Sequence, residues 1–304
     1  MIRIGLLLWS LLAAGFVWAG QLEVFSLGDL HEYEADPLCR HTLRDQLAVL
    51  AAVSPEHRLL LLAGDTLTHL YSTGKKALTN IPSGLTDPRT GKCYTYSDAD
   101  LKVVRDYDMQ YLALLGTVHP DVAVLGNHDS DRGVPWFAEL CRRNGIRLVA
   151  DDCSEALPWV MVDKVDSDGR HRKIGIVGLR GVVHIYPKKV DRPLPNSAVL
   201  IRAAREARAH GAEAVILLSH QPDADDTCLR NDPAVTAVFD LIVGAHSHNI
   251  FPASGQTAVT VFPPGGRPRQ LVVLKAGAHG GNLGRATLDF GPDHCLRRVT
   301  VWNR

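Results

Sequence analysis

Five short clusters of aspartate, asparagine and histidine stand out in this sequence as side chains that could hold a metal ion. In chain order they are Asp29-Leu30-His31, Gly64-Asp65, Gly126-Asn127-His128-Asp129, Ser219-His220 and Gly244-Ala245-His246-Ser247-His248. Carboxylate and amide oxygens mixed with imidazole nitrogens suit zinc, manganese, iron or cobalt rather than a calcium cage of oxygen ligands. A single cluster of this kind is more often turn chemistry or a hydrogen-bonded core histidine. The placement of the clusters along the chain decides between the two interpretations.

Each of the five clusters follows an apolar segment that has the length and composition of a β-strand. These segments are residues 22–27, 58–63, 121–125, 212–218 and 240–243. The apolar run at 58–63 is typical of a strand that is buried on both faces of a sheet. Ligands gather at strand ends in open α/β sheets, so we expect the clusters to meet. Five clusters, each at a strand end, favour a metal centre.

Helical segments alternate with these strands, which predicts an α/β fold. Apolar residues recur at helical spacing in several segments between the strands. The expected helices are 37–53, 101–115, 134–141 and 197–210. The further strands expected are 173–179, 258–262, 270–274 and 286–290. No linker or internal repeat interrupts the pattern, so we expect a single layered domain.

The order of the clusters, DxH, GD, GNHD, H and GxHxH, resembles that of calcineurin-like metallophosphoesterases. Two details resemble the catalytic domain of bacterial 5′-nucleotidases. In GNHDSD, Asp131 lies four residues after Asn127, and the segment LKAGAHGGNLGRATLDF at 274–290 is similar to the strands that close that domain. The resemblance covers most of residues 22–290 and is weakest between 67 and 100. It implies a layered α/β/β/α sandwich and a metal-dependent phosphoric ester hydrolase.

The resemblance also implies a role for each metal ligand. Asp65 would bridge two divalent metal ions. Asp29, His31 and His248 would complete the site of one ion, and Asn127, His220 and His246 that of the other. Two metals about 3.5–4 Å apart can clamp a phosphoryl group and generate hydroxide at neutral pH. The identity of the metals is left open by the spacing.

His128 and Asp131 would form the catalytic pair. Beside a ligand asparagine, His128 would reach the leaving oxygen, and Asp131 would hold its ring and favour the imidazolium form. An alternative for Asp131 is an acidic residue at the start of the helix expected at 134–141, where negative charge is favourable. Both roles are compatible with each other.

The first nineteen residues have the pattern of a signal peptide. Arg3 precedes an apolar run at 4–18, and Val17-Trp18-Ala19 offers small residues where a signal peptidase reads. The run is short for a membrane span, which needs about 20 residues, although a retained anchor is the alternative. We therefore expect a signal peptide at 1–19, a catalytic domain at 20–304, and a periplasmic or secreted protein with no membrane span after cleavage.

The charge of the chain excludes a strong general attraction to polyanions. Lysine and arginine number 33, and aspartate and glutamate also number 33. No global field therefore draws the chain to a nucleic acid duplex or to a membrane surface. The partner that we expect is a small phosphorylated substrate, and the oligomeric state is left open.

The six cysteines contain no CxxC pair, which argues against a thiolate zinc site. In an oxidising compartment an even number suggests disulfides, and six cysteines allow 15 pairings. The favoured pairing is Cys141 with Cys153, because they flank a short helix-to-strand passage. The alternative is that the cysteines are buried free thiols.

The function expected is hydrolysis of phosphomonoesters, either nucleotides or other small organic phosphates. Phosphodiesterase activity, including the opening of 2′,3′-cyclic nucleotides, and thiosulfate-ester hydrolysis are enzymatic alternatives. A secreted binding protein with the same fold is the non-enzymatic alternative. Bacterial 5′-nucleotidases usually carry a second, C-terminal domain that binds the base, and this sequence ends at Arg304. The long segment 66–100 is expected to overhang the site and to influence the choice of substrate.

Overall fold

A computed structural model describes residues 20–30, 37–67, 98–130, 133–181 and 197–303. Residues 1–19, His31, most of the segment 66–100 and Asp131 lie outside these ranges. Of the described residues, none lies in a helix that combines the length and the apolar character of a membrane span.

The first sheet has seven strands in the order β10-β13-β12-β1-β2-β3-β4. Strands β1 to β4 run parallel to one another, whereas the pairs β1–β12, β12–β13 and β10–β13 are antiparallel. The strands are β1 (Gln21–Leu27), β2 (Arg58–Leu62), β3 (Val122–Val124), β4 (Arg147–Val149), β10 (Thr257–Val261), β12 (Gly284–Phe290) and β13 (Leu296–Asn303).

The second sheet has six strands in the order β5-β6-β7-β8-β11-β9. Its central strands β6, β7, β8 and β11 are parallel, and β5 and β9 are antiparallel edge strands. The strands are β5 (Trp159–Val165), β6 (His171–Leu179), β7 (Ala214–Ser219), β8 (Leu241–Gly244), β9 (Ile250–Phe251) and β11 (Val273–Ala276).

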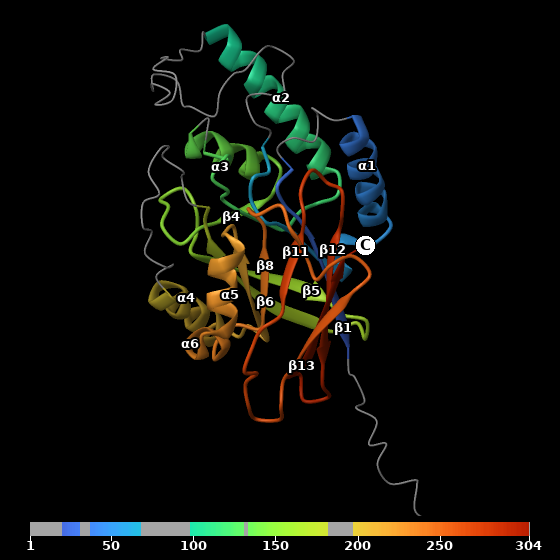
Figure 1. The fold of residues 1–304 in the computed structure, drawn as a ribbon, viewed down its shortest axis with the longest axis vertical. Helices are drawn as coiled ribbons and strands as arrows, with labels where there is room; N and C mark the ends of the chain where they lie inside the picture. The colour runs from blue at the N-terminus through green and yellow to red at the C-terminus, as the bar shows by residue number, and fades with distance from the viewer. Residues whose placement is uncertain (1–19, 31–36, 68–97, 131–132, 182–196, 304) are drawn as a thin grey trace, which may run out of the picture.

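The helices form two outer layers. Figure 1 shows α1, α2 and α3 at the top of the view and α4, α5 and α6 at its lower left, with the sheets at the centre. The helices are α1 (Pro37–Ala51), α2 (Asp98–Gly116), α3 (Val134–Arg143), α4 (Ser197–Ala209), α5 (Asp223–Asn231) and α6 (Pro233–Thr236), with a 3-10 turn at Pro55–His57.

Strand alternation divides the core between three apolar clusters. In β2, Leu59 and Leu61 point to the cluster between the sheets, and Leu60 and Leu62 point to the cluster under α1, α2 and α3. Residues of the second sheet, including Val215 and Leu217, pack instead against α4, α5 and α6. Every strand that contributes to two clusters is buried on both faces, which explains the continuous apolar runs in the sequence.

The layered α/β/β/α fold predicted from the sequence is confirmed. Two predicted elements start three residues away from the observed ones. The strand expected at 270–274 is β11 at Val273–Ala276. The helix expected at 101–115 is α2, which begins at Asp98, within the segment 66–100 that was expected to be a connection. Strands β5 and β13 and helix α5 were not predicted, since their sequences are half polar and carry weak periodicity.

The predicted disulfide between Cys141 and Cys153 is wrong. Both residues are free thiols, as are the other described cysteines, Cys228 and Cys295. Cys141 lies on the buried face of α3, packed in the core beside Phe137 and Leu140. The Cys153 thiol instead lies 3.3 Å from the carboxylate of Glu155. Proximity in the sequence did not fix the direction of either side chain.

Candidate metal centre

The predicted ligand clusters converge because they follow the carboxyl ends of parallel strands in both sheets. Asp29, Asp65 and Asn127 follow β1, β2 and β3 of the first sheet. His220 and His246 follow β7 and β8 of the second sheet. The site is therefore assembled across the junction of the two sheets.

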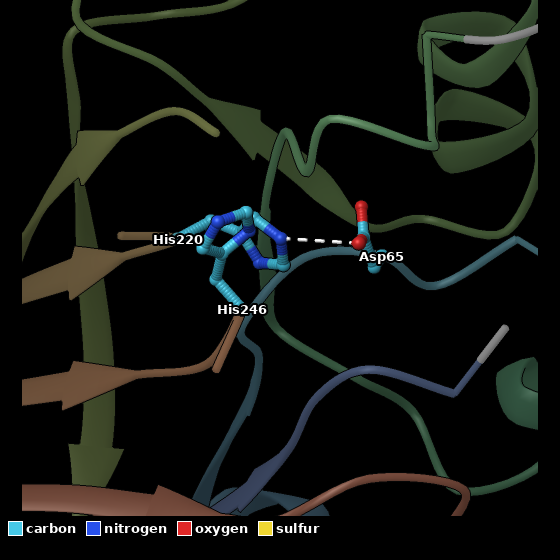
Figure 2. A group of neighbouring side chains, drawn as sticks. All are labelled: Asp65, His220 and His246. Atoms are coloured by element: carbon cyan, nitrogen blue, oxygen red, sulfur yellow. Dashed lines mark ion pairs between the residues drawn. The ribbon is translucent and has the colours of Figure 1, made fainter. Parts of the chain in front are cut away.

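Asp65, His220 and His246 form the centre of this site. Each offers one oxygen or nitrogen atom, and these atoms lie within 4.8 Å of one another. His220 Nε2 lies 3.2 Å from Asp65 Oδ2, and the rings of His220 and His246 meet edge to face with centroids 5.0 Å apart. Figure 2 shows the two imidazoles side by side, with Asp65 facing them. The group has the composition and spacing of a divalent metal site.

The Asn127 side chain lies between the same two histidines. Its Oδ1 atom is 3.2 Å from His220 Nε2 and 2.9 Å from His246 Nδ1. One amide oxygen, two imidazole nitrogens and one carboxylate oxygen thus face a common point. The structure thus brings together the predicted set of Asn127, His220, His246 and Asp65.

The orientation of His220 is fixed by the atom on the far side of its ring. His220 Nδ1 donates a hydrogen bond of 2.8 Å to the carbonyl oxygen of Ala63. A carbonyl can only accept, so Nδ1 carries the proton, and in the neutral ring Nε2 presents its lone pair to the site. This arrangement is typical of metal-binding histidines, whose other nitrogen is held by a hydrogen bond.

Asp29 lies between this group and His248. Asp29 Oδ1 is 3.9 Å from His220 Nε2 and 4.0 Å from His248 Nε2. The Asp29 carboxylate also accepts the backbone N–H of His246, at 2.8 Å to Oδ2. His248 is the most exposed of these residues, with 43% of its side chain accessible. Its predicted partner His31 lies outside the described residues, so the structure brings together Asp29, His248 and Asp65 of that second set.

The buried carboxylates of the site favour binding of a cation, as the shifted pKa values of Asp29 and His220 indicate. Burial and the charge of Asp65 together raise the pKa of Asp29 to about 7, against the opposing effect of His220. Burial lowers the pKa of His220, but Asp65 and Asp29 more than offset this effect and raise it to about 9. The metal-free protein thus holds protons where divalent cations would otherwise compensate the carboxylates. The donor set and the charge both fit a divalent metal.

The backbone at the site is held in an unusual conformation. Five residues there have positive φ without being glycine, at +47° to +76°: Asp29, Asp65, His246, His248 and His279. Such conformations cost about 1–3 kcal/mol each and gather at functional sites. The loops are also tightly packed, because a Cβ atom on Gly126 would overlap the backbone nitrogen and the carboxylate of Asp65. Only glycine fits at that position.

The backbone of His128 is bound to the central carboxylate. Its N–H donates to Asp65 Oδ1 at 2.8 Å, and its side chain is half-buried at the margin of the site. Its predicted partner Asp131 lies outside the described residues. The catalytic pair therefore stays a prediction.

Asp129 belongs to the site, although the sequence analysis gave it no role of its own. Its buried carboxylate accepts the backbone N–H groups of Thr66 and Leu67, at 2.8 and 2.9 Å, and that of Gly126 at 2.9 Å. These bonds join the loop that carries Asn127 to the loop that carries Asp65. Burial and the charge of Asp65 raise the pKa of Asp129 to about 7. Its position within the GNHD motif was the one signal available.

His279 also belongs to the site, although no role was predicted for it. The backbone N–H of His279 donates a hydrogen bond of 2.8 Å to the backbone carbonyl oxygen of Asp29. Its ring meets that of His248 edge to face, with centroids 5.4 Å apart. The loop between β11 and β12 therefore covers the Asp29 side of the centre.

Comparison with known proteins gives the family and the fold. A family model described as calcineurin-like phosphoesterase matches residues 23–249. A search of curated proteins gave no match.

Three solved structures share the fold at low sequence identity. The 5′-nucleotidase precursor of Thermus thermophilus has a TM-score of 0.59 and 17% identity, over 93% of this chain and 54% of that one. The calcineurin-like phosphoesterase YfkN of Bacillus subtilis has a TM-score of 0.62 and 16% identity, over 94% and 90%. The sulfate thiohydrolase SoxB of Thermus thermophilus has a TM-score of 0.58 and 17% identity, over 94% and 56%. The chain thus spans about half the length of the first and the third.

We predict that the metal-free protein loses stability as the pH rises from about 4 to about 9. Asp29 and Asp129 stay protonated in the folded state up to about pH 7, against an ordinary pKa of 3.8, and His220 up to about 9, against an ordinary pKa of 6.5. Folding therefore takes up protons across this range, so the free energy of unfolding falls with rising pH.

Urea unfolding of chelator-treated protein at about pH 5, 7 and 9 checks this prediction. Added divalent metal should weaken or reverse the trend, because metals bind the deprotonated ligands. A free energy of unfolding that is constant or rises with pH in the metal-free protein would contradict it.

Proposed function

The chain belongs to the calcineurin-like phosphoesterase family and is a metal-dependent phosphoester hydrolase, and we propose that it hydrolyses phosphomonoesters outside the cytoplasm. The substrates would be nucleotides or other small organic phosphates. The observation that carries the proposal is the convergence of Asp65, Asn127, His220 and His246 on one point at the junction of the sheets.

We propose that this centre holds two metal ions bridged by Asp65. Asn127, His220 and His246 would hold one ion, and Asp29, His31 and His248 the other. Asp29 lies next to both sets, since its carboxylate is about as far from His220 as from His248. When bound, such ions supply Lewis-acid stabilisation of the phosphoryl oxygens and acidify water.

The remaining chemistry is assigned to His128. As an imidazolium it would donate a proton to the leaving oxygen, and Asp131 would orient the ring and favour its charged form. The bond from the His128 backbone to Asp65 supports this role, because it fixes the residue at the margin of the metal centre. Asp65 would thus bind both metal ions and also hold the backbone of His128, the proposed general acid.

A direct assay tests the proposed function. The purified, metal-loaded protein should hydrolyse p-nitrophenyl phosphate and a nucleoside 5′-monophosphate, and a chelator should abolish both activities. Bis(p-nitrophenyl) phosphate and a thiosulfate ester serve as comparison substrates. Faster turnover of either would reassign the protein to the diesterases or to the thiosulfate-ester hydrolases, and no turnover of any ester would leave a binding protein.

Gly20 is packed within the folded domain. Its carbonyl oxygen accepts the N–H of Phe290, and a Cβ atom in its place would overlap the carboxylate of Asp166. Asp166 is itself buried in an ion pair with Arg172, at 2.6 Å. A chain that starts at Gly20 would therefore keep its first residue within the folded domain.

We predict that the mature protein begins at Gly20 or Gln21. The charged, apolar and small residues of the first nineteen positions motivate this start. Mass spectrometry of the protein purified from its native host gives the N-terminus directly. An intact Met1 would rule out cleavage and leave the anchored form.

We predict that Asp65→Ala strips both metals or leaves one loosely held, because it removes a ligand that the two ions share. His248→Ala should weaken only one. Metal analysis after gel filtration, with circular dichroism as the control for folding, separates the two results. Two firmly held metals in Asp65→Ala would refute the bridging role.

We predict that His128→Asn keeps its metals but loses activity according to the leaving group. General acid catalysis contributes about 10²–10⁴-fold, and it matters most for an alkoxide, which must be protonated as the bond breaks. The variant should lose about that much kcat on an alkyl phosphate and clearly less on p-nitrophenyl phosphate. Asn127→Ala is the comparison variant, since it should weaken one metal and lower both activities together. Equal losses on both substrates for His128→Asn would show that it only positions the phosphoryl group.

A further inference from the structure

A buried lysine lies beside the two loops that carry His220 and His246. Lys275, in β11, is only 2% exposed. Its ammonium group donates to the carbonyl oxygens of Gln221 and Ala245, each at 2.9 Å. It also lies 2.8 Å from one oxygen of Asp223 and 2.8 Å from one oxygen of Asp226. The charge is thus enclosed by four oxygens in the interior.

The two carbonyl groups belong to residues next to the proposed ligands. Gln221 follows His220, and Ala245 precedes His246. One ammonium group therefore binds the backbone of both loops, which come from different strands. An ammonium has three N–H donors, which is enough to bind both carbonyls and a carboxylate at once.

The two aspartates bind the same loops a second time. Asp226 accepts the hydroxyl of Ser219, the residue before His220, at 2.7 Å. The N–H of Asp223 donates to the hydroxyl of Ser247, the residue after His246, at 3.0 Å. Each histidine is therefore flanked on both sides by residues that bind Lys275 or one of its two partner aspartates.

The backbone of Gly244 packs closely against this ion pair. A Cβ atom on Gly244 would lie 2.7 Å from the Asp226 carboxylate and 2.9 Å from Lys275 Cε. A buried ion pair is weak support for stability, and apolar side chains often replace one at no cost. The contacts of this pair with both histidine loops suggest a task other than stability.

We propose that Lys275 is a positioning residue that holds the His220 and His246 loops at the separation the metal requires. The inference rests on the proposed metal centre and adds to it the residue that sets its affinity. Outer partners of metal ligands are worth about 10–100-fold in metal affinity or activity.

The test is cobalt binding by the Lys275→Met variant. Co²⁺ affinity is measured by chelator competition and by the visible absorption bands of the ion, and the melting temperature of the metal-free protein is measured alongside. We expect the affinity of at least one site to fall about 10–100-fold. Activity should fall at limiting Co²⁺ and recover at saturating Co²⁺, with KM for p-nitrophenyl phosphate unchanged.

Lys164→Met is the matched control. Lys164 is also a buried lysine, 2.6 Å from Asp121 and 2.7 Å from the carbonyl oxygen of Pro55, and it contacts none of the histidine loops in the part of the chain that the structure describes. This variant should lower the melting temperature but leave Co²⁺ affinity unchanged. Equal losses of affinity in both variants would show a general effect of a buried unpaired carboxylate and overturn the proposal.

The remaining outcomes separate the inference from the function on which it rests. A parent protein that binds no Co²⁺ would refute the proposed metal centre itself. Parent-like Co²⁺ affinity in a folded Lys275→Met variant would overturn only the role of Lys275. If Lys275→Met does not fold, Asp223→Ala decides, because Asp223 is half exposed and supplies one of the four oxygens. It should lower Co²⁺ affinity several-fold, and an unchanged affinity would overturn the proposal.

Discussion

The carboxylates of Asp29 and Asp65 lie close together in the interior, and the rest of the site is arranged around them. Burial and mutual repulsion disfavour their charged forms, as the raised pKa of Asp29 shows. Backbone N–H groups partly offset this cost: the N–H of His246 donates to Asp29, and the N–H of His128 donates to Asp65. It also places His220 beside both. These contacts stabilise the negative charge in advance of any bound cation.

The sequence was sufficient to predict the features that depend on local signals. A strand buried on both faces is visible as a continuous apolar run, and a ligand cluster at its end is visible as a break in that run. This is why Asp29, Asp65, Asn127, His220 and His246 could be predicted to lie close together, and why a layered α/β fold was predicted correctly. A resemblance of motifs was needed to group them into two sets.

What could not be predicted depends on contacts between residues far apart in the chain. Lys275 is an ordinary lysine in the sequence, and only the pairing of β11 with β8 places it beside the histidine loops. Asp129 binds two backbone groups more than sixty positions away. The error over Cys141 has the same origin, because the packing of α3 on the sheet, and not the short spacing, determines where the thiol points.

The pairing of β1 with β12 has a consequence for when the centre can form. These neighbouring strands come from the two ends of the domain, so Asp29 meets His279 only after almost the whole chain has been synthesised. Contacts of such sequence separation form slowly, because long loops must close first. A chain exported before folding would thus acquire its metals outside the cytoplasm. The ion found in the purified enzyme would then reflect the metal supply of the compartment in which folding ended.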